Sequence, residues 1–145
     1  MRSTYRVLAY LVAAGVLAQA ASVAYAWFTV IQQIDEGGVF DKNEGPNPGH
    51  LTHAITGMAV IPLIALAFLV VSFFARVPGG VRWAGLTFGL TALQVALAFV
   101  AFSAPVVGTL HGLNAIALLG VPLVAAHRAR RAGTAAAAQP VAAAA

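Results

Sequence analysis

Three of the four histidines in the chain lie where long apolar segments begin. His50 and His53 belong to the stretch PNPGHLTHAITGMAV, and His111 belongs to TLHGLNAIALLGVP. An ionisable side chain inside an apolar segment long enough to cross a bilayer is a functional-site candidate. Two imidazoles that face each other across an apolar gap can ligate a flat metal cofactor, and histidine is a common axial ligand of heme. We therefore take His53 and His111 as candidate metal ligands.

Two other apolar segments carry a glutamine in their interior, Gln19 in QAASVAYA and Gln94 in QVALAFVA. These amides are candidate cofactor-binding groups, which could hydrogen-bond a heme macrocycle or position a quinone. The structural alternative is a hydrogen bond between helices, which contributes about 0.6 kcal/mol inside a membrane. On that alternative His111 is a neutral histidine bonded across to Gln94.

The remaining chemistry in the sequence is sparse. His50 and His53 could bind zinc or copper together with acids of the preceding loop, although structural zinc sites usually have four ligands. His127 follows an apolar segment beside several arginines and is expected to be a solvated helix end. The chain has no cysteine, and it contains no nucleophile–base pair, phosphate loop or nucleic-acid surface. The pattern favours a role other than catalysis and excludes a nucleic-acid partner.

The candidate residues must be positioned by membrane-spanning helices. The 145 residues are 61% hydrophobic and only 8% charged, and the apolar residues form four blocks, at about 7–34, 51–75, 83–104 and 106–126. Each block reaches the roughly 20 residues of helix that cross a bilayer. Continuous apolar runs, without strict alternation, exclude a β-barrel. We predict an all-α, integral membrane four-helix bundle over residues 1–132 and a disordered cytoplasmic tail over 133–145.

The charges predict the orientation in the membrane. Seven of the eight basic residues lie on one side of the four blocks, and all four acids lie with Lys42 in the loop over residues 35–49. By the positive-inside rule both termini are cytoplasmic, the membrane is the cytoplasmic one and this loop is extracytoplasmic. An alternative is a signal peptide that ends at Ala24-Tyr25-Ala26, but the first apolar run is longer than a usual signal core.

A short internal repeat relates the two histidine-bearing segments. HAITGMAV, from His53, and HGLNAIAL, from His111, pair residues of similar size or polarity at every position. Gln19 and Gln94 precede them in corresponding segments. We predict an up-down bundle with a pseudo-twofold repeat of helix pairs, in which the two histidine-bearing spans lie on one diagonal.

The heights of the two histidines complicate this arrangement. His53 lies 23 residues before Arg76, whereas His111 lies only 17 residues before Arg128. At about 1.5 Å of rise per residue, the two would differ in depth by roughly 9 Å. Helix tilt, or an inner boundary beyond Arg128, would have to remove this difference for one ligand to bind both side chains.

These residues resemble two groups of proteins. Gln19, His53 with Gly57, and Leu110-His111-Gly112-Leu113-Asn114 together resemble a family of small four-span bacterial membrane proteins, a domain of unknown function, over nearly the whole chain except the tail. The placement of His53 and His111 is similar to one four-helix half of heme A synthase and to membrane b-type cytochromes. This second resemblance implies heme ligation. It does not imply the synthase reaction, because the spans contain no counterpart of that enzyme's acidic residue.

Three functions are compatible with the sequence. The first is a bis-histidine electron carrier with heme b between His53 and His111. The second is a non-catalytic membrane subunit or assembly factor, and the third is a small transporter or quinone-binding protein. The absence of an acid within the spans argues against a proton-coupled carrier. The expected partners are the lipid bilayer, a membrane protein or quinone, and a second copy of the chain packed through its glycines.

Overall fold

Four helical spans make up the computed structural model, which describes residues 1–41, 43 and 45–142, with side chains as far as residue 134. Each span is long and apolar enough to cross a membrane, and the described residues form no strand. The all-helical, four-span prediction is therefore confirmed. The spans are α1 (Arg2–Asp35), the run of α2 (Pro48–Ile55), η1 (Thr56–Val60) and α3 (Ile61–Ser72), then α4 (Gly80–Ser103) and α5 (Val107–Ala142).

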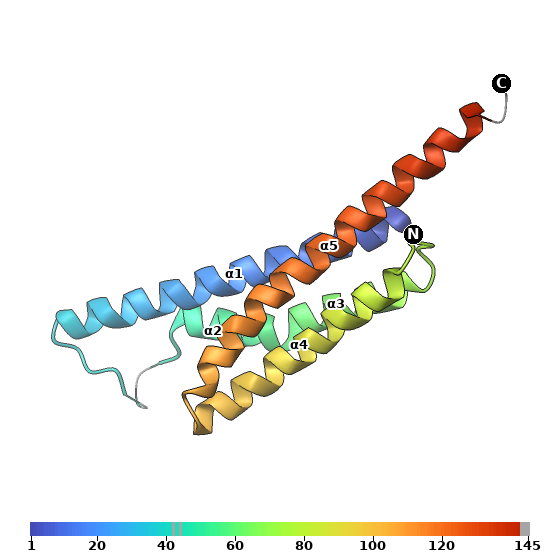
Figure 1. The fold of residues 1–145 in the computed structure, drawn as a ribbon. Coiled ribbons are helices and arrows are strands. Elements are labelled where there is room, and N and C mark those ends of the chain that lie inside the picture. The colour runs from blue at the N-terminus through green and yellow to red at the C-terminus, as the bar shows by residue number, and fades with distance from the viewer. Residues whose placement is uncertain (42, 44, 143–145) are drawn as a thin grey trace.

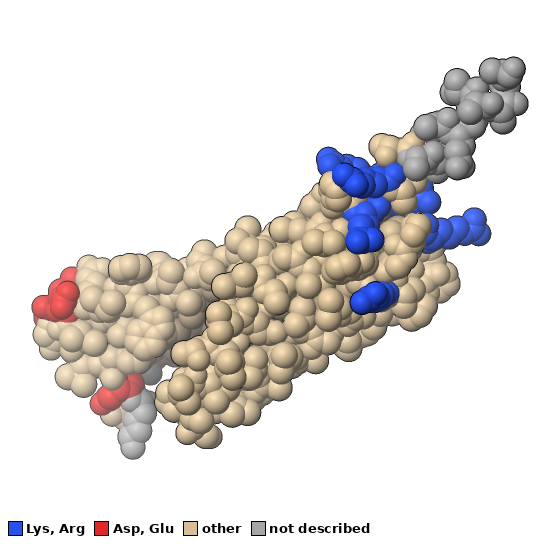
Figure 2. Space-filling model, viewed as in Figure 1, with Lys and Arg blue, Asp and Glu red and all other residues tan. Residues whose placement is uncertain are grey.

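The spans pack side by side in a ring. α1 contacts α5 on one side and the α2–η1–α3 span on the other, and α4 contacts both α3 and α5. The N-terminus and the turn from α3 to α4 lie at one end of the molecule, and the loop before α2 and the turn from α4 to α5 lie at the other (Figure 1). We call the first the arginine end, because Figure 2 shows the basic side chains gathered there and the acidic ones at the opposite end.

A buried tyrosine organises the core at the arginine end. The Tyr5 side chain is fully buried, its ring lies 4.6 Å from the Phe68 ring between centroids, and its hydroxyl donates to the Gly80 carbonyl oxygen at 3.0 Å. The first turns of α1 are thereby packed against both α3 and α4.

The start of α2 places His50 and His53, and its sequence explains where the helix begins. Asn47 is the N-cap, and its side-chain oxygen accepts from the backbone N–H groups of Gly49 at 2.9 Å and His50 at 3.2 Å. Pro48 takes the first helical position, where its missing N–H leaves no hydrogen bond unmade. Both histidines therefore lie on the first turns of the span, as predicted.

The second span is not a uniform α-helix. Residues Thr56–Val60 form the π-helical segment η1 immediately before Pro62. Proline has no N–H to bond the carbonyl of Met58, and its ring crowds that carbonyl, which favours a change of helical winding at this point. Proline alone does not enforce this change, because α5 runs through Pro122 as α-helix.

The last helix extends into the C-terminal segment. The sequence predicts a disordered tail over residues 133–145, and α5 is described as helix to Ala142. The segment is rich in alanine, which has the highest helix propensity of all residues, so a helix that has already formed can extend through it. The last three residues of the predicted tail, 143–145, lie outside the described residues.

The core role of Tyr5 can be tested by removing its hydroxyl group. Replacing Tyr5→Phe leaves the buried Gly80 carbonyl without its donor, and we expect a loss of about 1 kcal/mol in the free energy of unfolding. Tyr10→Phe is the matched control, because Tyr10 is 46% exposed. Unfolding in mild detergent, followed by tryptophan fluorescence, gives both values, and an equal effect of the two changes would contradict the assignment.

Candidate functional site

The first polar cluster joins α1 to the start of the second span and consists of Gln19, His53, Thr56 and Gly57. The His53 Nδ1 atom lies 3.2 Å from the Gln19 carbonyl oxygen. The Gln19 amide satisfies its neighbours when its nitrogen faces His53. It then donates to the His53 carbonyl oxygen at 3.0 Å, and its oxygen accepts from the Gly57 N–H at 3.2 Å and from the Thr56 hydroxyl. All four residues are half-buried.

The Gln19 amide inserts between two backbone groups of the neighbouring helix. In a regular α-helix the N–H of Gly57 would bond to the carbonyl of His53, and Gln19 reaches both groups. Insertion of a side chain into this ladder is one of the recognised causes of helix distortion. The amide therefore supports the backbone at the point where the span changes from α2 to the π-helical segment η1.

A glycine at position 57 makes this approach possible. A Cβ atom added to Gly57 would lie 3.0 Å from the terminal atom of the Gln19 amide that faces His53, which is the nitrogen in this orientation, and 3.5 Å from the Gln19 Cδ atom. Few Cβ atoms in proteins have neighbours that close, so a larger residue would push the amide away from the His53 carbonyl. The sequence pattern paired His53 with Gly57, and this contact is the physical reason for the glycine.

The second polar cluster joins α4 to α5 and consists of Gln94, His111 and Asn114. The His111 Nδ1 atom lies 3.0 Å from the Gln94 carbonyl oxygen, and the Gln94 amide donates to the His111 carbonyl oxygen at 3.0 Å. The Gln94 side-chain oxygen accepts from the Asn114 amide at 2.6 Å, and Asn114 also donates to the Leu90 carbonyl at 3.0 Å. The predicted alternative, that the glutamines bond between helices, is confirmed in both clusters.

The two clusters contain the same contacts. In each, a histidine Nδ1 atom approaches the glutamine carbonyl, the glutamine amide donates to the histidine carbonyl, and the glutamine oxygen contacts a polar side chain three residues after the histidine. That side chain is Thr56 in one cluster and Asn114 in the other. The sequence alignment paired these two residues but assigned them no role, although their common spacing from histidine was the available signal.

The histidines of the two clusters face each other. The ring centroids of His53 and His111 are 6.3 Å apart, with the ring planes tilted by 56°. The predicted difference in depth does not separate them, because the inner boundary was misplaced. Arg76 lies in the turn after α3 has ended at Ser72, whereas α5 continues well past Arg128.

The neighbours of Nδ1 determine what each imidazole can do. A carbonyl oxygen only accepts, so a contact with it requires the hydrogen on Nδ1 and leaves a lone pair on Nε2. For His111 the Gln94 carbonyl is the hydrogen-bond partner of Nδ1. For His53 the Gln19 amide nitrogen also lies 2.7 Å from Nδ1, so its tautomer depends on which neighbour is bonded. Metal ligation through Nε2 would require both histidines to carry the hydrogen on Nδ1 and to donate it to the glutamine carbonyl, as His111 can do.

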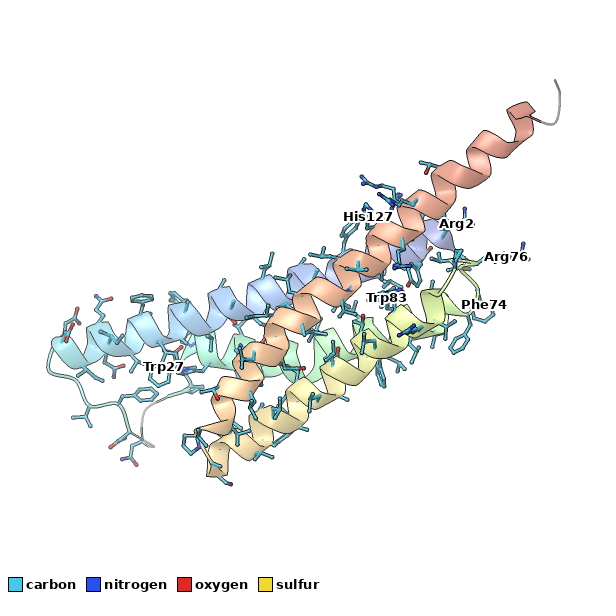
Figure 3. All side chains as sticks on the ribbon, in the orientation of Figure 1. Arg2, Trp27, Phe74, Arg76, Trp83 and His127 are labelled. Atoms are coloured by element: carbon cyan, nitrogen blue, oxygen red, sulfur yellow. The ribbon has the colours of Figure 1, made fainter. Side chains whose placement is uncertain are left out.

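The other two histidines lie apart from this pair. The His50 ring meets Trp27 edge to face at 5.4 Å and Phe40 at 6.3 Å between centroids, in an aromatic environment typical of the membrane interface. His127 is exposed near Arg2, at the other end of the molecule from Trp27 (Figure 3). Among the described residues no group of three or more histidines and acids could hold a metal ion, so the alternative of a zinc site at His50 and His53 gains no support.

Comparison with protein-family models, with curated proteins and with solved structures returns no match. The resemblances to the four-span family, to heme A synthase and to b-type cytochromes therefore stay predictions. The function must be argued from the geometry of the two polar clusters.

The close approach at Gly57 gives a stability test. We expect Gly57→Ala to lower the free energy of unfolding by about 1–3 kcal/mol, because the added methyl group overlaps the Gln19 amide. Gly85→Ala is the matched control, since a Cβ atom there meets nothing within 4 Å. Alanine is the better helix former, so this control should be neutral or slightly stabilising. Unfolding in detergent measures both, and equal effects would argue against the Gln19 contact.

Proposed function

We propose that this chain is a small membrane electron carrier that binds one heme b between His53 and His111. On this proposal the four spans cross the cytoplasmic membrane as an up-down bundle of two helix pairs with a pseudo-twofold repeat, and both termini are cytoplasmic. The observation that carries the proposal is the approach of two half-buried imidazoles to 6.3 Å between ring centroids.

This separation fits two histidines on opposite sides of one metal ion. An imidazole nitrogen lies about 2.0–2.1 Å from a bound metal, and the ring centroid lies about 1 Å beyond the nitrogen, so two opposed ligands place their centroids about 6 Å apart. Tetrahedral ligands would bring the centroids closer. A donor set of two histidines without an acid or cysteine also suits heme better than a structural zinc site.

The chain's own residues would orient the ligands. Metal-binding histidines commonly donate their second N–H to a backbone carbonyl, which fixes the tautomer and the direction of the ring. The carbonyl oxygens of Gln19 and Gln94 lie where they can accept this hydrogen, at 3.2 Å and 3.0 Å from Nδ1. The glutamine amides hold the same two turns through the histidine carbonyls. Heme, when bound, would supply reversible one-electron transfer.

The repeat is supported by the matched contacts of the two clusters. The α1–α2 pair and the α4–α5 pair each use one glutamine and one histidine in the same exchange of hydrogen bonds. The ring order of the helices puts the histidine-bearing spans across from each other. A parallel repeat of helix pairs accounts for both features, because it relates the first cluster to the second by a rotation about the bundle axis.

Heme binding can be tested by the visible spectrum. We expect the protein, purified in mild detergent from heme-sufficient cells, to show a Soret band that shifts on reduction. His53→Ala and His111→Ala should each abolish or strongly reduce it, because each removes one of the two histidines that would hold the heme iron. His127→Ala is the matched control, as this residue is exposed at the arginine end, and it should leave the spectrum unchanged.

Two results would contradict the heme proposal. One is a folded, colourless protein that stays colourless after hemin is added. The other is a spectrum that survives both substitutions.

The orientation can be tested by single cysteines, since the chain has none of its own. Val39→Cys, in the loop before α2, should react with a membrane-impermeant maleimide in intact spheroplasts. Pro78→Cys, in the turn from α3 to α4, should react only after lysis. Both positions are exposed, so the reverse labelling pattern would overturn the proposed topology.

A second candidate, a non-catalytic membrane subunit, is favoured by one observation. The side chains of Gln94 and Asn114 form hydrogen bonds within their helix pair, which is how polar residues hold membrane helices together. This candidate predicts a colourless protein that copurifies with a partner. The quinone alternative needs free glutamine amides, and both amides are engaged in the polar clusters.

A further inference from the structure

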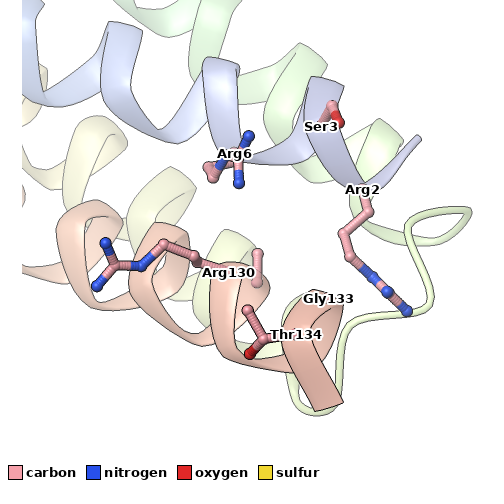
Figure 4. A pocket seen from close by; sticks show the side chains of 7 residues that line it. Arg2, Ser3, Arg6, Arg130, Gly133 and Thr134 are labelled. Atoms are coloured by element: carbon pink, nitrogen blue, oxygen red, sulfur yellow. The ribbon is translucent and has the colours of Figure 1, made fainter. Parts of the chain in front are cut away.

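A cavity of about 290 Å³ opens at the arginine end (Figure 4). It lies between the first turns of α1 and the part of α5 that carries Arg130, Gly133 and Thr134. We call it the arginine pocket. Small side chains on α5 leave the space open, since a Cβ atom at Gly133 would first meet Arg2 Cδ at 3.9 Å. The residues that define it are Arg2, Ser3 and Arg6 from α1 and Arg130, Gly133 and Thr134 from α5.

The pocket is positively charged and has no nearby acid among the described residues. Three guanidinium groups line it, and arginine stays protonated in proteins. The described acidic residues lie at the opposite end of the molecule (Figure 2), and no ion pair forms within the described part of the chain. An anion bound beside these uncompensated charges would be stabilised by them, most strongly by the guanidinium groups nearest to it.

The N-terminus of α1 adds to the positive electrostatic potential of the pocket. Its N-cap, Met1, makes no side-chain capping bond, and its first turn contains no acidic residue. Among the described residues, no capping side chain or acid therefore offsets the positive end of the α1 dipole. Ser3, in this first turn, lines the pocket.

Arg2 forms one side of the arginine pocket, and one of its nitrogen atoms makes no hydrogen bond with a described residue. Its terminal nitrogens donate to the carbonyl oxygens of Arg76 at 3.3 Å and Ala132 at 3.4 Å, which hold the guanidinium between the α3–α4 turn and α5. Its Nε atom is buried and makes no hydrogen bond with any described residue. A buried donor without a partner costs free energy that an anionic acceptor could recover.

We propose that the arginine pocket binds a phosphate group, with the headgroup of an anionic phospholipid as its expected source. Arg6 lies between Arg2 and Arg130, and the Arg130 side chain runs along α5 on the side away from Arg2 (Figure 4). Guanidinium groups match phosphate oxygens in charge and geometry. Basic pockets between membrane helices are known lipid headgroup sites, and Arg128 over the Trp83 ring, at 5.2 Å, marks the membrane interface at this end.

Native mass spectrometry of the full-length protein in detergent tests the proposal. The probes are dioleoylphosphatidylglycerol, zwitterionic dioleoylphosphatidylcholine and inorganic phosphate. We expect one phosphatidylglycerol to bind preferentially over phosphatidylcholine. The double variant Arg6→Gln/Arg130→Gln should weaken this binding by at least tenfold, from roughly fivefold for each arginine removed. Arg2 is left unchanged because it also ties three segments together.

The matched control is Arg82→Gln/Arg131→Gln, which removes the same charge at the same end but outside the pocket. Its affinity for phosphatidylglycerol should lie within about twofold of that of the unchanged protein, because the pocket residues remain. Inorganic phosphate alone could stabilise the protein against heat, with only Arg6→Gln/Arg130→Gln losing this effect. That result would support the phosphate site and identify its ligand as a soluble phosphate. Equal loss in both double variants, or no preference for either phosphate probe, overturns the site.

Discussion

The exchange of hydrogen bonds between a glutamine and a histidine on paired helices is the interaction on which the rest of this structure depends. Inside a bilayer no water satisfies a backbone group that has lost its partner. The Gln19 amide reaches the His53 carbonyl and the Gly57 N–H, and it can do so because position 57 has no side chain. The span can therefore change to π-helix within an apolar environment without leaving these groups unpaired.

The same exchange determines where the imidazoles lie. Each histidine is held to the helix before it, through its ring nitrogen and its backbone carbonyl, so the histidines lie on the inner sides of the two helix pairs. Because the pairs pack in a ring, the rings of His53 and His111 meet. The proposed heme site thus follows from two local pairings that were brought together by the packing of the four helices.

Different interactions stabilise the two ends of the molecule. Around the histidines, polar contacts within each helix pair determine the geometry. At the arginine end, Tyr5 is buried against Phe68, and Arg2 ties the first turn of α1 to the α3–α4 turn and to α5. The arginine pocket lies beside this junction. Its charge comes from arginines of α1 and α5 that lie at the same end of the molecule.

The sequence by itself determined the four spans, the asymmetry of charge, the Asn47 cap and the choice of His53 and His111. These depend on composition, on helix period and on neighbours along the chain. The tertiary structure decided the rest. Contacts between residues far apart in sequence paired Gln19 with Gly57 and engaged both glutamine amides. Packing also brought the two histidines to one level, which counting residues to the nearest arginine could not show because helix ends and arginines do not coincide. In residues 133–142 a preformed helix extends into an alanine-rich segment, as the high helix propensity of alanine allows.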